Sequence, residues 1–407
     1  MIRKLHINNY KSLHDLTLEV GRFNVLIGEN GCGKSNLLEA IALVAAAAAR
    51  KLDHEFLASR GIRVTEPKLM RSAFSDETLQ QPIKIAVGFE NLDEVEQYTL
   101  INDNQPYAKW VKTRKLSDLV SIWKRAKDIK GSVSKHESEL TSAETVYTEI
   151  GELEKEILDF ATCSYFENNE EEAKNYLSRC GDIENKEDKV KNFIIYSPEN
   201  TALRNFYKEG QIEPLGINGE GLLKLLKVIQ SKSPEQRQDI HTSLQLFDWY
   251  TELDIPNDLS SSEDKVTITD RYLTQVFDQR SANEGFLFVL FYIALMVSDD
   301  TPKIFAIDNI DTSLNPKLCT KLIKELVRLA KKYDKQVFVT THNPAVLDGI
   351  DLGDDEQRLL VLSRNKQGHT RYKRITLEDK PRSSTDEDLK LSEAFLRGYL
   401  GGLPKGF

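Results

Sequence analysis

The sequence predicts an α/β fold, and three stretches of the chain carry this prediction. Residues 23–27 form a short apolar run that passes into a glycine-rich loop and then into the helix-forming segment 36–49. Residues 304–307 form a second apolar run, which ends in Asp308, and residues 337–340 form a third. Buried strands that alternate with helices are typical of a parallel sheet with helices on its faces.

Composition and charge limit the class of protein. The chain has 407 residues, of which 40% are hydrophobic, so we expect more than one compact unit. The sequence has no run of about eighteen apolar residues and no apolar signal core at its start, which predicts a cytoplasmic protein. The four cysteines lack zinc-finger spacing and are expected to be reduced thiols. The net charge of −9 means that any nucleic-acid contact must come from a local patch.

The glycine-rich loop has the pattern G-x-x-x-x-G-K-S of a phosphate-binding P-loop, and it runs from Gly28 to Ser35. Glycines let backbone N–H groups close around phosphates, Lys34 brings a positive charge, and Ser35 offers a hydroxyl to Mg²⁺. The alternative is a glycine-rich turn that binds nothing, which the strand before the loop and the helix after it disfavour. We therefore predict ATP and Mg²⁺ as ligands, and the candidate nucleotide-binding residues here are Asn30, Gly31, Cys32, Gly33, Lys34, Ser35 and Asn36.

Further strands are predicted on both sides of the P-loop helix. Residues 2–8 and 16–20 alternate apolar and polar side chains, as half-buried strands do. Residues 83–89 and 193–196 also form strand-like apolar runs. The polar and basic segment 56–82 is expected to be irregular.

The second half of the candidate site follows the later apolar runs. Asp308 ends a buried strand, where its carboxylate can hold Mg²⁺ opposite Ser35. His342 follows residues 337–340 in the segment Thr341-His342-Asn343-Pro344, where a histidine can reach a γ-phosphate. A lone histidine more often packs or faces solvent, but its place after these ordered motifs favours the functional interpretation.

The segment I-x-K-L-x-I-x-N-Y-K-S-L, followed by N-V-L-I-G-E-N-G-C-G-K-S-N-L-L-E-A-I, resembles the start of the RecF/SMC/OLD branch of ABC-type ATPases. The segment 308–316, which ends Leu314-Asn315-Pro316, is similar to the Walker B motif and D-loop of that branch, and Thr341–Pro344 is similar to its switch histidine. The resemblance covers residues 1–50, 190–230 and 280–404. It implies a two-lobed ABC-type P-loop ATPase head.

The resemblance also implies roles for residues outside the P-loop. Lys11 would lie near the nucleotide, although an exposed hairpin lysine is an equal alternative. The stretch before the helix at 287–297 is the degenerate candidate for the ABC signature, with Ser281, Asn283 and Gly285 expected to meet the γ-phosphate held by a second copy. Such heads form a homodimer or higher oligomer with ATP between the two protomers.

Asn309 is the main departure from the family pattern. The residue after the Walker B aspartate is normally a glutamate that polarises the attacking water, and asparagine cannot take up its proton. Asp311 or His342 is the candidate replacement. Because Asn309 cannot act as the base itself, the sequence predicts slow or absent hydrolysis of ATP.

The middle of the chain has a different composition and is expected to form a helical insertion. The resulting domain boundaries are 1–105 for the first part of the head, 106–190 for the insertion, and 191–407 for the second part. Nine lysines and arginines against two aspartates between residues 109 and 135 are a candidate contact for nucleic acid or an acidic partner. The alternative is a solvated helix face that binds no partner.

The tail is predicted to contain a hairpin, with strands at 358–362 and 369–375, and a last helix from about residue 391. By family analogy, stand-alone OLD-like heads resemble the ATPase subunits of bacterial anti-phage systems such as Septu and PARIS. The leading functional hypothesis is therefore an ATP-binding regulator of a separately encoded nuclease or toxin. The alternatives are a RecF-like DNA-repair ATPase and, less favoured, a small-molecule P-loop kinase.

Overall fold

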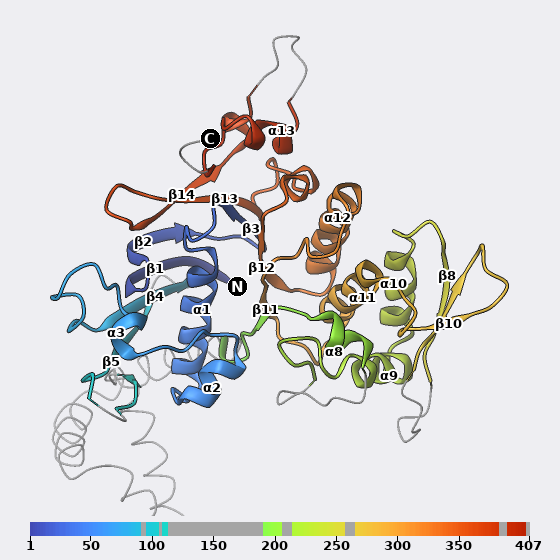
Figure 1. Ribbon diagram of the computed structural model, residues 1–407, viewed down its shortest axis with the longest axis horizontal. Coiled ribbons are helices and arrows are strands. Elements are labelled where there is room, and N and C mark those ends of the chain that lie inside the picture. The colour runs from blue at the N-terminus through green and yellow to red at the C-terminus, as the bar shows by residue number, and fades with distance from the viewer. Residues whose placement is uncertain are drawn as a thin grey trace, which may run out of the picture. The chain divides into compact units, whose positions relative to one another are not determined.

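The computed structural model describes residues 1–90, 95–105, 108–112, 190–205, 214–256, 265–381 and 389–403 (Figure 1). The chain divides into two compact units, one made of Met1–Val111 and Asp188–Phe407 and the other of Lys112–Glu187. The first unit carries the P-loop and Asp308. The predicted insertion over residues 106–190, with its basic segment 109–135, lies almost wholly outside the described residues.

An antiparallel sheet forms the N-terminal part of the first unit. Its strand order is β2-β1-β4-β5-β6. The alternating pattern buries Leu5 and Ile7 of one strand against the P-loop helix and leaves Lys4 and His6 on the outer face. The strands are β1 (Ile2–Tyr10), β2 (Leu13–Glu19), β4 (Ile83–Phe89), β5 (Val95–Ile101) and β6 (Val111–Lys112).

The segment 56–82 was expected to be irregular, and this is wrong in part. It contains the end of α2 (His54–Ser59), which Asp53 caps by accepting from the Phe56 N–H at 2.9 Å, and the short helix α3 (Pro67–Met70). The buried side chain of Asn9 organises the loop that follows, because its amide donates to Thr78 O at 2.8 Å and its oxygen accepts from Ser72 N at 3.1 Å.

The central sheet has the order β14-β13-β3-β12-β11-β7, and all its neighbouring strands are parallel except the β13–β14 hairpin. The strand β3 lies between β12 and β13, so the carboxyl ends of β3, β11 and β12 meet at one edge. This confirms the predicted strands and the C-terminal hairpin. The strands are β3 (Phe23–Gly28), β7 (Ile195–Tyr196), β11 (Ile304–Ile307), β12 (Gln336–Thr341), β13 (Gln357–Arg364) and β14 (Thr370–Ile375).

The two faces of this sheet pack against different helices. Leu26 and Phe338 lie on the face covered by α1 (Lys34–Ala48), whereas Val25 and Val339 lie on the opposite face with α11 (Glu284–Val297) and α12 (Pro316–Lys332). The helix α11 is apolar all round and is buried from Gly285 to Val297, as expected for a helix enclosed in a core. None of the described helices is both long and apolar enough to cross a membrane.

A second lobe lies beyond α11, on the right of Figure 1. It contains a small antiparallel sheet of order β10-β9-β8, which the sequence did not predict. The elements are α8 (Asn200–Arg204), α9 (Leu222–Lys232), α10 (Pro234–Leu244), β8 (Tyr250–Asp254), β9 (Thr267–Asp270) and β10 (Phe277–Asp278). The tail adds η1 (Pro344–Gly349), η2 (Leu377–Asp379) and α13 (Leu391–Leu396).

Lys335 has a buried side chain that supports the core just before β12. Its side chain is fully buried, and Nζ donates to Ser298 O at 2.7 Å, to Thr301 O at 3.0 Å and to Thr301 Oγ1 at 2.8 Å. Burial lowers the pKa of Lys335 to about 7. The side chain therefore serves as a donor to a ring of main-chain carbonyls.

We expect Lys335→Met to lower the free energy of unfolding by about 2 kcal/mol, because the substitution leaves buried carbonyls without a donor. Urea denaturation at pH 7 measures this. The matched control is Lys331→Met on the exposed face of α12, which should change stability by less than about 0.5 kcal/mol. Equal stability of the two variants would contradict a structural role for the Lys335 hydrogen bonds.

Candidate nucleotide-binding site

The P-loop joins β3 to α1 through glycines that adopt positive φ. Gly28, Gly31 and Gly33 have φ of +155°, +78° and +109°, which side chains with a Cβ rarely adopt. Gly33 is the N-cap of α1, and Lys34 is its first residue. The loop therefore ends at the N-terminus of a fifteen-residue helix, where unpaired N–H groups and the helix dipole favour an anion.

The hairpin β13–β14 and the β1–β2 turn hold the loop from outside. The hydroxyl of Thr370 lies 2.8 Å from Cys32 O and 2.7 Å from Ser12 Oγ, and Ser12 Oγ also accepts from Asn36 Nδ2 at 2.8 Å. Arg364 Nε donates to Gly31 O at 2.7 Å. Sequence reasoning missed Thr370 and Arg364 because they lie more than 300 residues away along the chain.

We expect Gly33→Ala to destabilise the protein more than Gly31→Ala. A Cβ at Gly33 would lie 2.3 Å from Thr370 Oγ1 and 2.8 Å from Ser12 Oγ, whereas a Cβ at Gly31 would meet nothing within 4 Å. Both variants carry the cost of a left-handed backbone, about 1 kcal/mol, and Gly33→Ala adds a clash of about 2 kcal/mol. Thermal unfolding without nucleotide compares them, and equal losses would show that the contact with Thr370 is unimportant.

Lys34, Ser35 and Asp308 come together at the edge of the central sheet. Lys34 is 6% exposed, and its ammonium donates to Gly28 O at 2.8 Å and to Glu29 O at 3.1 Å. Burial lowers the pKa of Lys34, while the nearby Cys32 and Asp308 act in the opposite direction. Ser35 Oγ donates to Asp308 Oδ2 at 3.2 Å. The structure thus brings Ser35 and Asp308 into contact, with Lys34 next to Ser35 in the chain.

The donor set fits Mg²⁺ bound together with a phosphate group. A hydroxyl and a carboxylate, side by side, are hard oxygen ligands, and Mg²⁺ usually takes one or two such protein ligands and completes its shell with phosphate oxygens and water. Within the described residues, no group of three or more His, Cys, Asp and Glu side chains gathers around a point. Ser35 and Asp308 therefore suit a shared metal–nucleotide site better than a metal site made by the protein alone.

The end of β12 fixes the residues that follow β11. Thr340 Oγ1 donates to Asp308 Oδ1 and accepts from the Asn309 N–H at 2.8 Å. Asp311 Oδ1 accepts from Thr341 Oγ1 at 2.6 Å and from the His342 N–H at 3.4 Å. The predicted residues Asn309, Asp311 and His342 thus lie at the same sheet edge as Asp308.

Asn309 and His342 both face solvent at this edge. Asn309 has φ of +54°, a left-handed conformation that asparagine tolerates better than most residues. Partial burial lowers the pKa of His342, and the charge of Lys34 lowers it further. His342 is therefore neutral near pH 7 and can accept or donate a hydrogen bond.

Lys11 lies beside the P-loop helix in an ion cluster around the buried Glu39. Its Nζ donates to the carboxylate of Glu39, which is 1% exposed, and to Arg63 O at 3.1 Å. Arg63 Nε donates to Glu39 at 2.5 Å, and Arg63 Nη2 donates to Asn36 at 3.0 Å. Burial would lower the pKa of Arg63, but Glu39 and Asp308 raise it overall. Lys11 is therefore already paired, and Arg63 is an exposed cation near the site that sequence reasoning missed.

The candidate signature residues lie at the N-terminus of α11. Asn283 is the N-cap, and its oxygen accepts from Phe286 N at 2.8 Å. A Cβ at Gly285 would lie 3.0 Å from Ser313 O, so the glycine allows the segment after β11 to approach the helix. Ser281 is exposed, and among the described residues neither Ser281 nor Gly285 hydrogen-bonds the P-loop of the same chain. The assignment of Ser281, Asn283 and Gly285 to the ABC signature therefore stays a prediction.

Comparisons with known proteins agree with this geometry. A protein-family model described as "AAA domain, putative AbiEii toxin, Type IV TA system" matches residues 23–348. No curated protein matches the chain.

Two of the solved structures that match the chain are heads of Smc proteins. A Smc head bound to the C-terminal winged-helix domain of ScpA is 14% identical, with a TM-score of 0.53 over 93% of this chain and 98% of that chain. A Smc head from Pyrococcus furiosus, with an extended coiled coil and bound to the C-terminal domain of ScpA, is 13% identical, with a TM-score of 0.48 over 93% and 96% of the two chains. At this identity the first likeness shows the fold alone, which is the ABC-type ATPase head predicted from the sequence.

Proposed function

The chain belongs to the family of AAA domains described as putative AbiEii toxins of type IV toxin–antitoxin systems, and from this premise we propose that it is an ATP-binding regulator of a separate effector protein. The effector is a nuclease or toxin, and the setting is bacterial defence against phage. Binding of ATP switches the regulator between states, and slow hydrolysis sets how long the ATP state lasts.

One observation carries this proposal. Lys34, Ser35 and Asp308 lie at one edge of the central sheet and supply a cation, a hydroxyl and a carboxylate, which suit a nucleoside triphosphate with Mg²⁺, but the residue after Asp308 is Asn309. The site is therefore equipped to bind ATP and poorly equipped to take a proton from water. A site of that kind suits a nucleotide-controlled switch better than a fast motor.

Each residue of the site has a distinct part in this proposal. Lys34 neutralises phosphate charge, and Ser35 and Asp308 hold Mg²⁺, which supplies charge neutralisation at the phosphates when bound. Asn309 orients water through its amide without accepting a proton, and His342 hydrogen-bonds the terminal phosphate region. Ser281 and Gly285 meet the phosphates held by a second copy, so ATP joins two protomers into a homodimer.

The test uses the protein together with the product of the neighbouring gene. The two are co-expressed and purified as a complex, and cleavage of DNA and RNA is measured without nucleotide, with ADP·Mg²⁺ and with ATP·Mg²⁺. We expect the effector's activity to differ at least tenfold between the ATP and ADP states, and the difference to vanish in a complex that carries Lys34→Ala. Activity that is the same in all three nucleotide conditions would contradict the proposal.

A further inference from the structure

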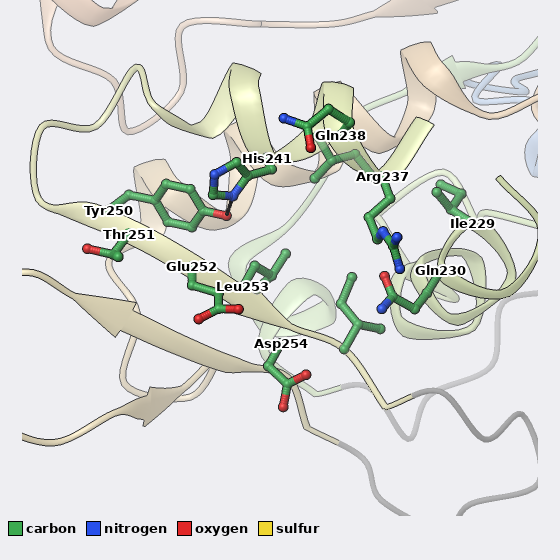
Figure 2. A pocket seen from close by; sticks show the side chains of 12 residues that line it. Ile229, Gln230, Arg237, Gln238, His241, Tyr250, Thr251, Glu252, Leu253 and Asp254 are labelled. Atoms are coloured by element: carbon green, nitrogen blue, oxygen red, sulfur yellow. Dashed lines mark hydrogen bonds between the residues drawn. The ribbon is translucent and has the colours of Figure 1, made fainter. Parts of the chain in front are cut away.

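The second lobe contains an open groove between β8 and the helices α9 and α10. The groove has a volume of about 400 Å³, which is in the range of ligand-binding pockets. Figure 2 shows β8 along one side, with Arg237 and His241 of α10 and Gln230 of α9 on the other. It lies in a different lobe from the P-loop and shares none of its lining residues with the site described above.

The groove follows the backbone edge of β8, not one face of its sheet. Side chains of a strand alternate between the two faces, so a pocket on one face would be lined by every second residue. Here all six consecutive residues from Tyr250 to Ile255 line the groove. In addition, β8 is the last strand in the order β10-β9-β8, and within the described residues no strand pairs with its outer side. Edge backbone of this kind can pair with an added strand.

Charged side chains line the groove, and one end of it is held by a hydrogen bond. Glu252 and Asp254 are exposed, lie two residues apart on the same face of β8, and make no ion pair among the described residues. Across the groove, Arg237 points inward beside Gln230 (Figure 2). The ring of Tyr250 is buried, and His241 Nδ1 lies 3.1 Å from its hydroxyl, which fixes one end of the groove.

We propose that this groove binds an extended peptide segment of the effector protein as an added β-strand beside β8. Backbone hydrogen bonds to the outer edge of β8 supply affinity that does not depend on the guest's side chains, as in other strand-addition complexes. Basic side chains at alternate positions of the guest lie opposite Glu252 and Asp254, where cross-strand pairs of opposite charge stabilise the pairing. Arg237 donates to guest carbonyls from the helical wall.

This inference rests on the proposed function only for the identity of the partner, since peptide binding at β8 needs no nucleotide. The probe is a fluorescein-labelled heptapeptide of alternating lysine and valine, which begins and ends with lysine. Its binding to the full chain is followed by fluorescence anisotropy without ATP. Two comparison peptides are a block sequence of the same composition, with four lysines followed by three valines, and the alternating peptide methylated at its backbone nitrogens, which cannot donate to β8.

We expect the alternating peptide to bind at least tenfold more tightly than either comparison peptide. The double variant Glu252→Lys/Asp254→Lys should lose at least tenfold in affinity for the alternating peptide and should gain affinity for an alternating glutamate–valine peptide. The matched control, Asp76→Lys/Glu77→Lys, makes the same charge change at two exposed carboxylates of the other lobe and should bind like the wild type.

Equal binding of the alternating, block and methylated peptides would show adsorption by charge and would overturn the proposal, as would absence of binding to the wild type. Hydrogen exchange places the site, because the amides of residues 250–255 should become protected in the complex, and protection elsewhere alone would also overturn it. ATP titration of the same preparations shows separately whether the nucleotide site functions, so failure of the groove and failure of the proposed ATP switch are distinguishable.

Discussion

The variant Lys34→Ala is expected to bind ATP at least a hundredfold more weakly than the wild type. The Lys34 ammonium is the only cation that lies inside the P-loop itself among the described residues, and it is buried beside Ser35 and Asp308. Hydrogen bonds between a buried cation and phosphate are among the strongest in proteins, and a hundredfold loss corresponds to about 2.7 kcal/mol. Isothermal titration calorimetry with ATP·Mg²⁺ measures the loss.

The control is Lys84→Ala, which removes an exposed lysine from β4 and should leave ATP affinity unchanged. Because Lys34 also donates to Gly28 O and Glu29 O, circular dichroism must show that Lys34→Ala is folded. A folded Lys34→Ala protein with wild-type affinity would remove the P-loop from the mechanism.

The second large effect is expected for Asn309→Glu, which should accelerate ATP hydrolysis by roughly 10²–10⁴-fold, the usual contribution of a general base. The N–H of Asn309 donates to Thr340 Oγ1, and a glutamate at this position keeps that backbone hydrogen bond. Its side chain would therefore start from the same backbone position beside Asp308. Its φ of +54° costs a glutamate about 1 kcal/mol of stability, which the fold can tolerate. Phosphate release at saturating ATP measures the rate.

Asn309→Gln is the matched control, because it lengthens the side chain equally and adds no proton acceptor. It should hydrolyse ATP as slowly as the wild type, and all three proteins should bind ATP with similar affinity. If the wild type turns over rapidly and Asn309→Glu adds nothing, another residue is the base. A loss of rate in Asp311→Asn would then identify Asp311 as the base. In the structure, the Asp311 carboxylate accepts a hydrogen bond from Thr341 Oγ1.

The sequence predicted the parts of the site whose chemistry is local. Residues 28–35 combine glycines, a lysine and a hydroxyl within eight positions, and Asp308 ends a buried strand, so both were recognisable from the chain alone. Their contact at 3.2 Å followed from the rule that carboxyl ends of parallel strands meet at one edge of a sheet.

Other parts of the site depend on contacts between distant residues, which no local pattern carries. Thr370 and Arg364 support the P-loop from a hairpin that the sequence predicted only as a hairpin. Lys11 was a candidate for the nucleotide, but the buried Glu39 that pairs with it is an unremarkable helix residue in the sequence. The pairing arises only when the β1–β2 turn packs on α1.

The small sheet of the second lobe was missed for a physical reason. The strands β9 and β10 have four and two residues, too short to show a period of two, and β8 mixes Tyr250 and Leu253 with exposed acids. Their stability comes from packing of Tyr250 and Trp249 against Phe286 of α11, with ring centroids 5.9 Å and 5.2 Å apart. Tertiary contacts therefore define these strands.

Sedimentation velocity with and without nucleotide tests the central claim, that ATP joins two copies through the P-loop of one and the α11 N-terminus of the other. Because we expect slow hydrolysis with asparagine at position 309, ATP·Mg²⁺ itself should hold the wild type as a dimer, whereas the protein without nucleotide and with ADP·Mg²⁺ should sediment as a monomer. Ser281→Arg, at the exposed candidate signature position, should bind ATP and remain monomeric. A wild type that binds ATP by calorimetry yet sediments as a monomer in every condition would contradict the account.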